Sequence, residues 1–377
     1  MNILISSKIV FDDHNNIRKE LFNLVGIVEQ TNHKVYIISR QQNKAKYLTY
    51  INSNNELKDK LDFVDRSSIS TRFTNESDLQ SKDFVLIGGV DEDIRISSNN
   101  NILLLNPTWI NTSSKVQKYG FDIDSPEQMI KCLKILEINS SVYSRNNISE
   151  NTELISISSA RNNGATDEQN FIINSYRDYL KKSEDKYKYA VFFHYLTLIT
   201  QNSEFKDVDY WLSAPSSSGD KKDGIYEIED YSRYLMSKKR KYEIIIRHTP
   251  AQKSTEINSR FRRQLDSSRH FETLHLNPKF KNKLKDVTVA VLDDYVTNGH
   301  TFEAVRNLLT EAGVKKIYLI TMGTYKMPYQ VQQVVFKDDI INPKFDFEII
   351  SKENITLQYD ENALITIDEI YKIITNK

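Results

Sequence analysis

The stretch VTVAVLDDYVTNGHTFEAVRNLL, residues 287–309, contains the features that decide the fold. VTVAVL is an almost continuous apolar run of strand length, which predicts a central strand buried on both faces. The run ends at two adjacent carboxylates, Asp293 and Asp294. A short polar loop follows, in which Gly299 tolerates the positive φ of a tight turn and Thr301 is a favourable helix N-cap. The sequence therefore predicts a strand, an acidic edge, a loop and a helix in succession.

The helix after this loop is predicted to be amphipathic. Its apolar face carries Phe302, Val305, Leu308 and Leu309, and Gly313 stands near the expected C-cap. In a parallel sheet such a loop lies at the carboxyl edge, where α/β folds bind ligands. Its N–H groups and the helix N-terminus favour a phosphate, and two neighbouring carboxylates can accept hydrogen bonds from a diol. The spacing alone is equally consistent with an ordinary strand-turn-helix that has acidic residues at a solvated edge.

Composition restricts the class of protein. The chain has 377 residues, enough for two domains, and 51 Lys plus Arg balance 51 Asp plus Glu. A net charge near zero indicates neither a nucleic-acid nor a membrane partner. The single cysteine, Cys132, excludes an internal disulfide framework and a cysteine-based zinc site. The sequence has no recognisable signal peptide or membrane-spanning run, so we expect a cytoplasmic protein.

The order of apolar runs predicts two α/β regions. Strands are expected at 2–6, 34–39, 84–89 and 101–106, and then at 208–215, 242–248, 287–294 and 315–325. Helices are expected at 126–138, 170–182 and 190–200. This alternation favours mainly parallel sheets flanked by helices. We therefore expect a domain at 1–140, a Ser- and Asn-rich linker at 141–170, a second domain at 171–330, and a C-terminal extension at 331–377 without an assigned role.

The segment VAVLDDYVTNGHT resembles the signature of the type I phosphoribosyltransferases, which is an apolar strand, two acidic residues, two further positions and a five-residue phosphate loop. The resemblance implies that Asp293 and Asp294 are the catalytic pair and face the ribose hydroxyls of phosphoribosyl pyrophosphate (PRPP). It also implies a 5-phosphate loop made of Thr297, Asn298, Gly299, His300 and Thr301. Asn298 replaces the usual threonine, and Tyr295 replaces a small apolar residue.

A basic segment at residues 244–271 narrows the resemblance. The order of Arg247, Thr249-Pro250, Gln252 and Arg260 is similar to that of the phosphoribosyltransferase domain of the ComF competence-protein family, over about residues 170–325. The family usually has Asn where this chain has Arg263, and its zinc-ribbon cysteines are absent. The resemblance implies a pyrophosphate site formed by Ala214, Pro215, Ser216, Ser217, Ser218, Arg247, Lys253, Arg260 and Arg263. Without the resemblance, residues 255–265 predict only a solvated basic helix.

The first region has a weaker resemblance to another family. VLIGGVDEDI, residues 85–94, resembles the last acidic motif of haloacid dehalogenase-like (HAD-like) phosphatases, with Asp93 matched and Gly89 in place of the first acidic residue. Ser39 matches the strand end that touches phosphate in those enzymes. The first strand ends at Ser6-Ser7, where the family has its nucleophilic aspartate. We therefore expect a HAD-like domain that has lost catalysis and serves binding or scaffolding.

Together these resemblances imply a phosphoribosyltransferase-like protein that binds PRPP and Mg²⁺, with the ion held mainly through PRPP. As a glycosyltransferase-class enzyme of nucleotide metabolism, it would transfer the phosphoribosyl group to or from a nucleobase-like acceptor with exchange of pyrophosphate. The alternative is a non-catalytic PRPP- or nucleotide-sensing protein, with a role in DNA uptake or defence. A homodimer is expected only by analogy with such transferases.

Overall fold

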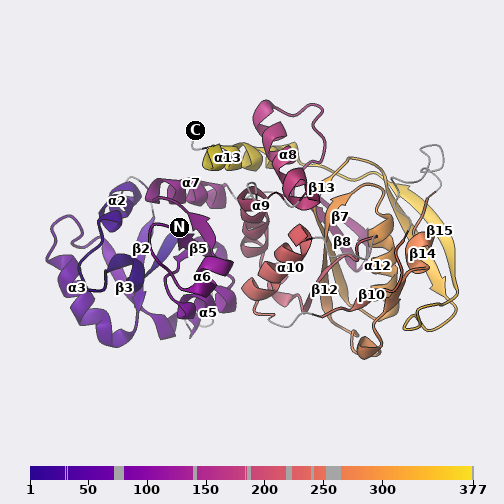
Figure 1. Ribbon diagram of the computed structural model, residues 1–377, viewed down its shortest axis with the longest axis horizontal. Helices are drawn as coiled ribbons and strands as arrows, with labels where there is room; N and C mark the ends of the chain where they lie inside the picture. Colours follow the sequence, from indigo (N-terminus) through magenta and orange to yellow (C-terminus); the bar gives the residue numbers. More distant parts are fainter. Residues whose placement is uncertain are drawn as a thin grey trace.

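The structure, a computed structural model, describes residues 1–29, 31, 33–71, 80–138, 142–182, 184, 188–217, 223–238, 242–251 and 265–375. The chain has an α/β architecture with two main sheets. The sheets lie side by side along the long axis of the molecule, with helices around and between them (Figure 1). The prediction of mainly parallel sheets flanked by helices is confirmed at this level.

The first sheet has six parallel strands in the order β3-β2-β1-β4-β5-β6. They are β1 (Asn2–Ser6), β2 (Lys34–Ser39), β3 (Leu61–Asp65), β4 (Phe84–Ile87), β5 (Leu103–Pro107) and β6 (Phe121–Ile123). The helices of this region are α1 (Ser7–Val10), α2 (Lys19–Val28), α3 (Lys44–Asn52), α5 (Asp91–Asn100), α6 (Ser114–Tyr119) and α7 (Pro126–Glu137). From β1 the chain adds β2 and β3 on one side of the sheet, and then β4, β5 and β6 on the other side. The boundary between β1 and β4 is therefore a topological switch point.

Both faces of this sheet are buried, which explains why its strands are continuous apolar runs rather than alternating ones. Ile3 and Ile5 belong to the cluster that includes α2 and α7, whereas Leu4 belongs to the cluster with α5 and α6. The start of α7 follows the sequence rules, because the Ser125 side chain accepts a hydrogen bond from Gln128 N and Pro126 occupies the first turn.

The second sheet is mixed, with the order β7-β8-β13-β12-β9, and only β7 is antiparallel to its neighbour. Its strands are β7 (Ser144–Ser149), β8 (Thr152–Ser156), β9 (Tyr210–Ser213), β12 (Thr288–Val296) and β13 (Lys316–Thr324). The helices are α8 (Asp167–Lys182), α9 (Lys188–Gln201), α10 (Asp223–Leu235), α11 (Ser268–Phe271) and α12 (His300–Glu311). A small antiparallel pair is formed by β10 (Ile245–Arg247) and β11 (Leu274–Leu276).

The two faces of the second sheet pack against different elements. Ala290 and Leu292 of β12 belong to the cluster that contains residues of α8, α9 and α10. Val289 and Val291 belong to the cluster that contains α12 and the β10–β11 pair. This alternation along one strand follows from the two-residue period of strand side chains.

Residues 141–170, expected to be a linker, contain structure. Residues 144–156 form β7 and β8, and β8 pairs with β13 in the middle of the second sheet. The composition was misleading because β7, SRNNIS, is an edge strand with polar side chains, and β8 is only five residues long. The sequence rules for strands favour long or strongly apolar runs, so they missed this hairpin.

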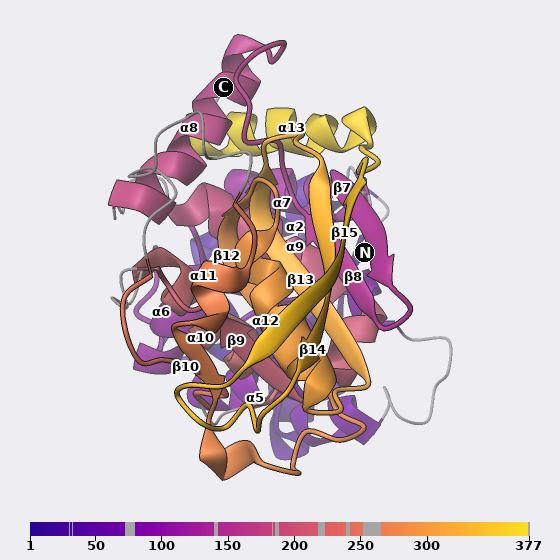
Figure 2. The same ribbon diagram turned by 90° about the vertical axis from the view of Figure 1, so that its right-hand side faces the viewer.

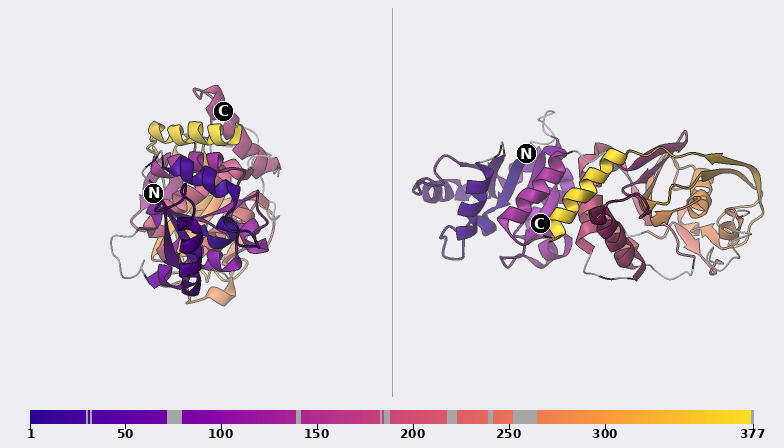
Figure 3. Two further views of the ribbon diagram at one scale, coloured as in Figure 1. Left: turned by 90° about the vertical axis from the view of Figure 1, so that its left-hand side faces the viewer. Right: turned by 90° about the horizontal axis from the view of Figure 1, so that it is seen from above.

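The C-terminal extension forms a hairpin and a helix. The antiparallel strands β14 (Tyr329–Phe336) and β15 (Phe347–Ile355) cross in front of α12, as Figure 2 shows. The final helix, α13 (Leu364–Thr375), packs against α7, α8 and α9. Seen from above, α13 lies across the boundary between the two regions (Figure 3). The extension thus contacts both halves of the chain.

The two regions share one hydrophobic core. A single cluster of buried residues extends from the first sheet through α9 and α13 to the second sheet. Phe121 of β6 and Phe193 of α9 are in contact, with ring centroids 4.7 Å apart. Tyr119 of α6 stacks on Tyr234 of α10 at 3.7 Å. Short 3₁₀ turns complete the described structure at Gln41–Asn43, Arg66–Ser68, Ser81–Asp83, Ser203–Asp207, Pro278–Phe280 and Glu361–Ala363.

Candidate functional site

The two predicted carboxylates lie on β12, between β13 and β9. The strand continues to Val296, so Asp293 and Asp294 are part of it, and the expectation that the strand ends at Asp294 is wrong by two residues. Asp293 Oδ1 accepts a hydrogen bond from Asp294 N at 2.9 Å, and Asp294 Oδ1 accepts one from Tyr295 N at 2.7 Å. Asp294 is buried and Asp293 is partly exposed, and both line the same large pocket.

Lys181, from the last turn of α8, forms an ion pair with Asp294 Oδ2. Its Nζ also lies 5.4 Å from the centroid of the Tyr295 ring. The Lys181 side chain is 43% exposed, whereas that of Asp294 is 4% exposed. One of the two carboxylates is therefore neutralised by a cation that can withdraw into solvent. No sequence motif indicates this pair, because 113 positions separate its members.

The 297–301 loop turns at Gly299, whose φ is +84°. A Cβ atom at this position would lie 2.1 Å from Cε2 of Tyr329, so glycine is required by both conformation and space. Gly299 is also the N-cap of α12, which begins at His300. The prediction that Thr301 caps this helix is wrong, because Thr301 already lies within its first turn.

Asn298 holds the loop against the segment that precedes β14. Its Nδ2 donates to Pro328 O at 3.0 Å, and its carbonyl accepts from Gln330 N at 3.0 Å. The Asn298 side-chain amide is thus engaged in holding the loop in place. Phosphate recognition by the loop would rest mainly on backbone N–H groups at the α12 N-terminus.

A buried polar network links the loop to the C-terminal hairpin. Glu303 is 0% exposed and pairs with Arg306, with Arg306 Nη2 2.7 Å from Glu303 Oε2. The Tyr329 hydroxyl donates to Glu303 Oε1 at 2.8 Å, and Gln332 N donates to Oε2 at 2.7 Å. Charged groups are tolerated in an interior only when they are paired and hydrogen-bonded in this way. The hairpin is therefore an integral wall of the site, a role that the sequence did not reveal.

The segment 214–217, expected to bind pyrophosphate, follows β9. Ala214 N donates to Leu292 O at 2.7 Å, which ties the segment to β12 next to the carboxylates. Ser217 O accepts a hydrogen bond from Ala251 N at 2.8 Å. Pro215, Ser216 and Ser217 line the same large pocket as the 297–301 loop. The structure thus brings these predicted residues together.

Arg247, at the end of β10, reaches this segment. Its Nη2 donates to Pro215 O at 3.1 Å and lies 3.3 Å from His270 Nδ1, while Nη1 donates to Thr273 Oγ1. Burial, together with the nearby Arg269 guanidinium, lowers the pKa of Arg247 to about 10. Arg247 and Arg269 repel each other in this partly buried position, so an anion that binds beside them would stabilise both charges.

Two histidines beside the loop are held neutral. Burial and then the Arg269 charge lower the pKa of His300 to about 4. Burial, followed by Arg269 and Arg247, holds the pKa of His270 well below its usual value. His270 Nε2 lies 3.4 Å from Thr301 Oγ1. Neutral imidazoles can donate or accept hydrogen bonds at neutral pH without adding charge.

The pocket formed by these elements has a volume of about 1040 Å³. Of the predicted site residues it is lined by Pro215, Ser216, Ser217, Asp293, Asp294 and residues 297–301. Ala214 and Arg247 are not among its lining residues, although both contact residues that are. The lining residues that sequence reasoning missed include Lys181, His270, Tyr325, Met327, Gln330 and Asn354. The predicted residues Ser218, Lys253, Arg260 and Arg263 lie outside the described part of the chain.

The carboxyl edge of the first sheet is arranged differently. Asp93, in the first turn of α5, accepts hydrogen bonds from Gly89 N and Val90 N at 2.8 and 2.9 Å. It pairs with Arg66 Nη2 at 3.0 Å and is 0% exposed. Burial raises the pKa of Asp93 even with this cation beside it. The acidic residue matched to the phosphatase motif is therefore enclosed by its own neighbours.

A metal ion would depend on a bound ligand. Among the residues that the structure describes, no group of three or more His, Cys, Asp or Glu side chains could hold a metal ion. Mg²⁺ retains several waters and is bound through one or two carboxylates plus phosphate oxygens. The adjacent carboxylates of β12 fit that mode but do not form a metal site by themselves.

Comparison with known proteins adds no assignment. No family model matches the chain, and no curated protein matches it. Among the described helices, none is both long enough and apolar enough to cross a membrane.

Proposed function

We propose that this chain is a phosphoribosyltransferase-like protein that binds PRPP together with Mg²⁺. The observation that carries the proposal is the pocket of about 1040 Å³, which contains two adjacent carboxylates, a glycine-centred loop at a helix N-terminus and the 215–217 segment. These three features match the three polar parts of PRPP, which are a diol, a phosphate and a pyrophosphate. The same proposal assigns residues 171–330 to a ComF-like transferase domain and residues 1–140 to a degenerate HAD-like domain.

Each element has one role in the proposed complex. Asp293 and Asp294 accept hydrogen bonds from the ribose hydroxyls, and the backbone of residues 297–301 binds the 5-phosphate. The 214–217 segment and Arg247 bind the pyrophosphate. Mg²⁺, held by pyrophosphate oxygens and water beside the two carboxylates, would neutralise charge on the leaving group.

The proposed reaction replaces pyrophosphate at the anomeric carbon by a nitrogen nucleophile. The C–O bond to pyrophosphate breaks and its electron pair leaves with the pyrophosphate, while the acceptor nitrogen forms the new C–N bond and loses its proton. Positive charge builds on the ribose ring during this step. Because the chain needs mainly to position the reactants and to stabilise the leaving anion, preorganised donors are the important groups.

The Lys181–Asp294 ion pair favours a second candidate, a non-catalytic PRPP sensor. This pair occupies one of the two carboxylates assigned to the ribose, so binding would require Lys181 to move. A displacement of this kind can convert ligand binding into a change at α8, which is useful to a sensor and costs affinity in an enzyme.

The test is calorimetric titration of PRPP with Mg²⁺ against the wild type and the double variant Asp293→Asn/Asp294→Asn. We expect micromolar binding by the wild type and at least a hundredfold weaker binding by the variant. The control is Asp338→Asn/Asp339→Asn, an adjacent and exposed acidic pair in the turn of the C-terminal hairpin, which should bind like the wild type. A folded wild type that does not bind PRPP contradicts the proposal. Pyrophosphate release with added nucleobases distinguishes the transferase from the sensor.

A further inference from the structure

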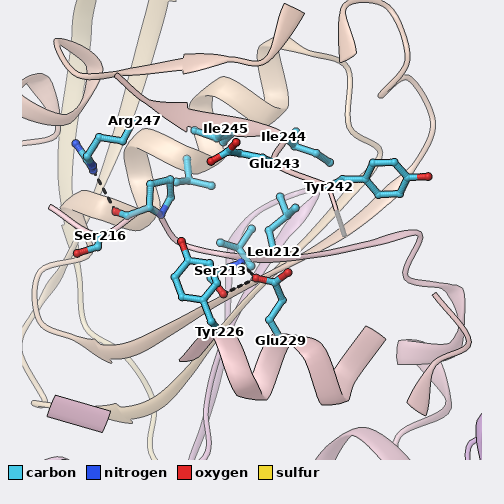
Figure 4. A pocket seen from close by; sticks show the side chains of 13 residues that line it. Leu212, Ser213, Ser216, Tyr226, Glu229, Tyr242, Glu243, Ile244, Ile245 and Arg247 are labelled. Carbon is cyan, nitrogen blue, oxygen red and sulfur yellow. Dashed lines mark hydrogen bonds between the residues drawn. The ribbon is translucent and has the colours of Figure 1, made fainter. Parts of the chain in front are cut away.

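A second cavity lies behind the 215–216 segment. It has a volume of about 230 Å³ and lies between β9, α10 and β10 (Figure 4). It shares Pro215 and Ser216 with the large pocket. Its described lining residues do not include Asp293, Asp294 or the 297–301 loop, so it is a separate space with one common wall.

The polar side of this cavity is built around Glu229 of α10, which is 2% exposed. Glu229 Oε2 accepts hydrogen bonds from Ser213 N at 3.1 Å and from Ser213 Oγ at 2.6 Å. Its Oε1 lies 3.6 Å from Arg233 Nε. A carboxylate has several lone pairs and accepts more than one hydrogen bond, so Glu229 can accept an N–H donor from the cavity in addition to these partners.

The other walls combine aromatic and aliphatic side chains with two charged ones, Glu243 and Arg247. The Tyr226 ring stands between Ser216 and Glu229, as Figure 4 shows. Leu212, Ile244 and Val291 supply buried aliphatic surface. Pockets for drug-sized molecules measure roughly 300–1,000 Å³. A cavity somewhat below that range, with an aromatic wall and a buried acceptor, suits a one- or two-ring planar compound.

We propose that this cavity is a binding site for a small planar heterocycle that carries an exocyclic amino group, the class to which the amino-substituted nucleobases belong. Tyr226 stacks on or against the ring, and Glu229 accepts its N–H groups. The inference does not rest on the proposed PRPP function, because none of the residues assigned to ribose or 5-phosphate lines the cavity. Since Pro215, Ser216 and Arg247 do line it, a molecule bound there contacts residues assigned to pyrophosphate.

The test uses adenine and cytosine as probes, titrated calorimetrically into the full chain, with uracil as a probe that lacks an exocyclic amine. We expect adenine or cytosine to bind the wild type at least tenfold more tightly than uracil does. Tyr226→Ala and Glu229→Gln should each weaken that binding at least tenfold. Asp293→Asn/Asp294→Asn should leave it unchanged within twofold. Tyr226→Leu, which removes the ring but keeps an apolar side chain, replaces Tyr226→Ala if the latter lowers stability, and Tyr226→Phe, which keeps the ring, should bind like the wild type.

Each outcome decides the matter. No binding of adenine or cytosine at millimolar concentration overturns the inference, as does binding that is lost in the aspartate variant but retained in both cavity variants. The second result would locate the base in the large pocket. PRPP titration separates the two proposals, because PRPP binding without base binding defeats only this inference, and base binding without PRPP binding defeats only the proposed function.

Discussion

The carboxyl edges of the two sheets have a similar architecture but differ in whether a pocket is present. Each edge has an acidic residue paired with a cation, Asp93 with Arg66 in the first sheet and Asp294 with Lys181 in the second. In the first pair the Arg66 side chain is only 17% exposed and the carboxylate also caps α5. In the second pair the lysine is half in solvent and the carboxylate lines a large pocket. One edge is filled by its own side chains, and the other retains space for a ligand.

This difference shows that an acidic residue at a sheet edge does not by itself indicate a site. The deciding property is whether the cation paired with the carboxylate can move away into solvent. A buried ion pair that loses one partner leaves an uncompensated charge, which costs about 3–5 kcal/mol, whereas a partly exposed pair contributes about 1 kcal/mol or less. The following substitutions test the comparison, in order of expected effect.

The largest effect is expected for Gly299→Ala. The alanine Cβ would overlap the Tyr329 ring, and the residue would have to hold a φ of +84°. Backbone strain and overpacking each cost about 1–3 kcal/mol, so the loss of stability should be about 4 kcal/mol, with PRPP binding lost. Urea unfolding and titration measure both.

The control for this substitution is Gly164→Ala. Gly164 has a φ of +85°, but no atom lies within 4 Å of the position that an alanine Cβ would take, so only strain of about 1–2 kcal/mol should remain. An equal decrease in the free energy of unfolding for Gly299→Ala and Gly164→Ala would mean that contact with Tyr329 does not shape the loop.

The next largest effect is expected for Arg66→Met. It leaves Asp93 buried without its cation, so the free energy of unfolding at pH 7 should fall by about 3 kcal/mol. Removal of the cation raises the already raised pKa of Asp93 further. A carboxyl whose folded pKa is above the unfolded value is favoured in acid, so the loss should shrink as the pH is lowered toward 4. A variant that unfolds like the wild type at pH 7 would show that the first edge is not closed by this pair.

The layer between the two regions provides a pH test. His194 of α9 is fully enclosed and lies 2.8 Å from the Tyr176 hydroxyl, and burial lowers its pKa from 6.5 to about 4. A histidine with a lowered folded pKa stabilises the fold above pH 6.5 and loses that stability as the pH falls toward 4. Between pH 7 and 4.5 the loss from this group should be about 2 kcal/mol.

The variant His194→Gln should therefore show a smaller decrease in stability between these two pH values than the wild type does. The exposed His14→Gln is the control and should follow the wild type. An unchanged pH dependence in His194→Gln would contradict the burial of a neutral imidazole between the sheets.

The smallest effect is expected for Lys181→Met. It should change stability by about 1 kcal/mol or less and, because the ligand no longer competes for Asp294, should raise PRPP affinity severalfold. Lys182→Met removes the neighbouring lysine, which pairs with Asp178 and is 60% exposed, and should not change affinity. A tenfold loss of affinity in Lys181→Met would instead show that this lysine binds the ligand.

The sequence revealed the parts of the fold and site that are local. The predicted strands at 2–6, 34–39, 287–294 and 315–325 are confirmed to within two residues at each end, because they are continuous apolar runs in the interior of a sheet. β15, FEIISKENI, was not assigned because it lies on a two-stranded hairpin where six of its nine side chains are exposed and none is buried. The spacing of apolar residues in a sequence reflects which side chains are buried, so a strand that buries few side chains has no clear apolar pattern.

The site divides in the same way. The two aspartates and Gly299 were recognised because they are neighbours in one motif. Lys181, His270 and Tyr329 were missed because their roles arise only when α8, α11 and β14 meet β12. Thr301 was assigned as the helix cap on residue preference, but Gly299, with its positive φ, is the N-cap, so the helix begins two residues earlier than predicted.

The contact between Tyr329 and Gly299 also has a consequence for biosynthesis. The chain leaves the ribosome from its N-terminus, so the 297–301 loop is made before the hairpin that encloses it. At about 5–20 residues per second, Tyr329 follows Thr301 by a few seconds. During that interval Glu303 and Arg306 lack their hydrogen-bond partners on β14, and the loop lacks its contact with the Tyr329 ring. The pocket is therefore completed only after residues 329–355 have been synthesised.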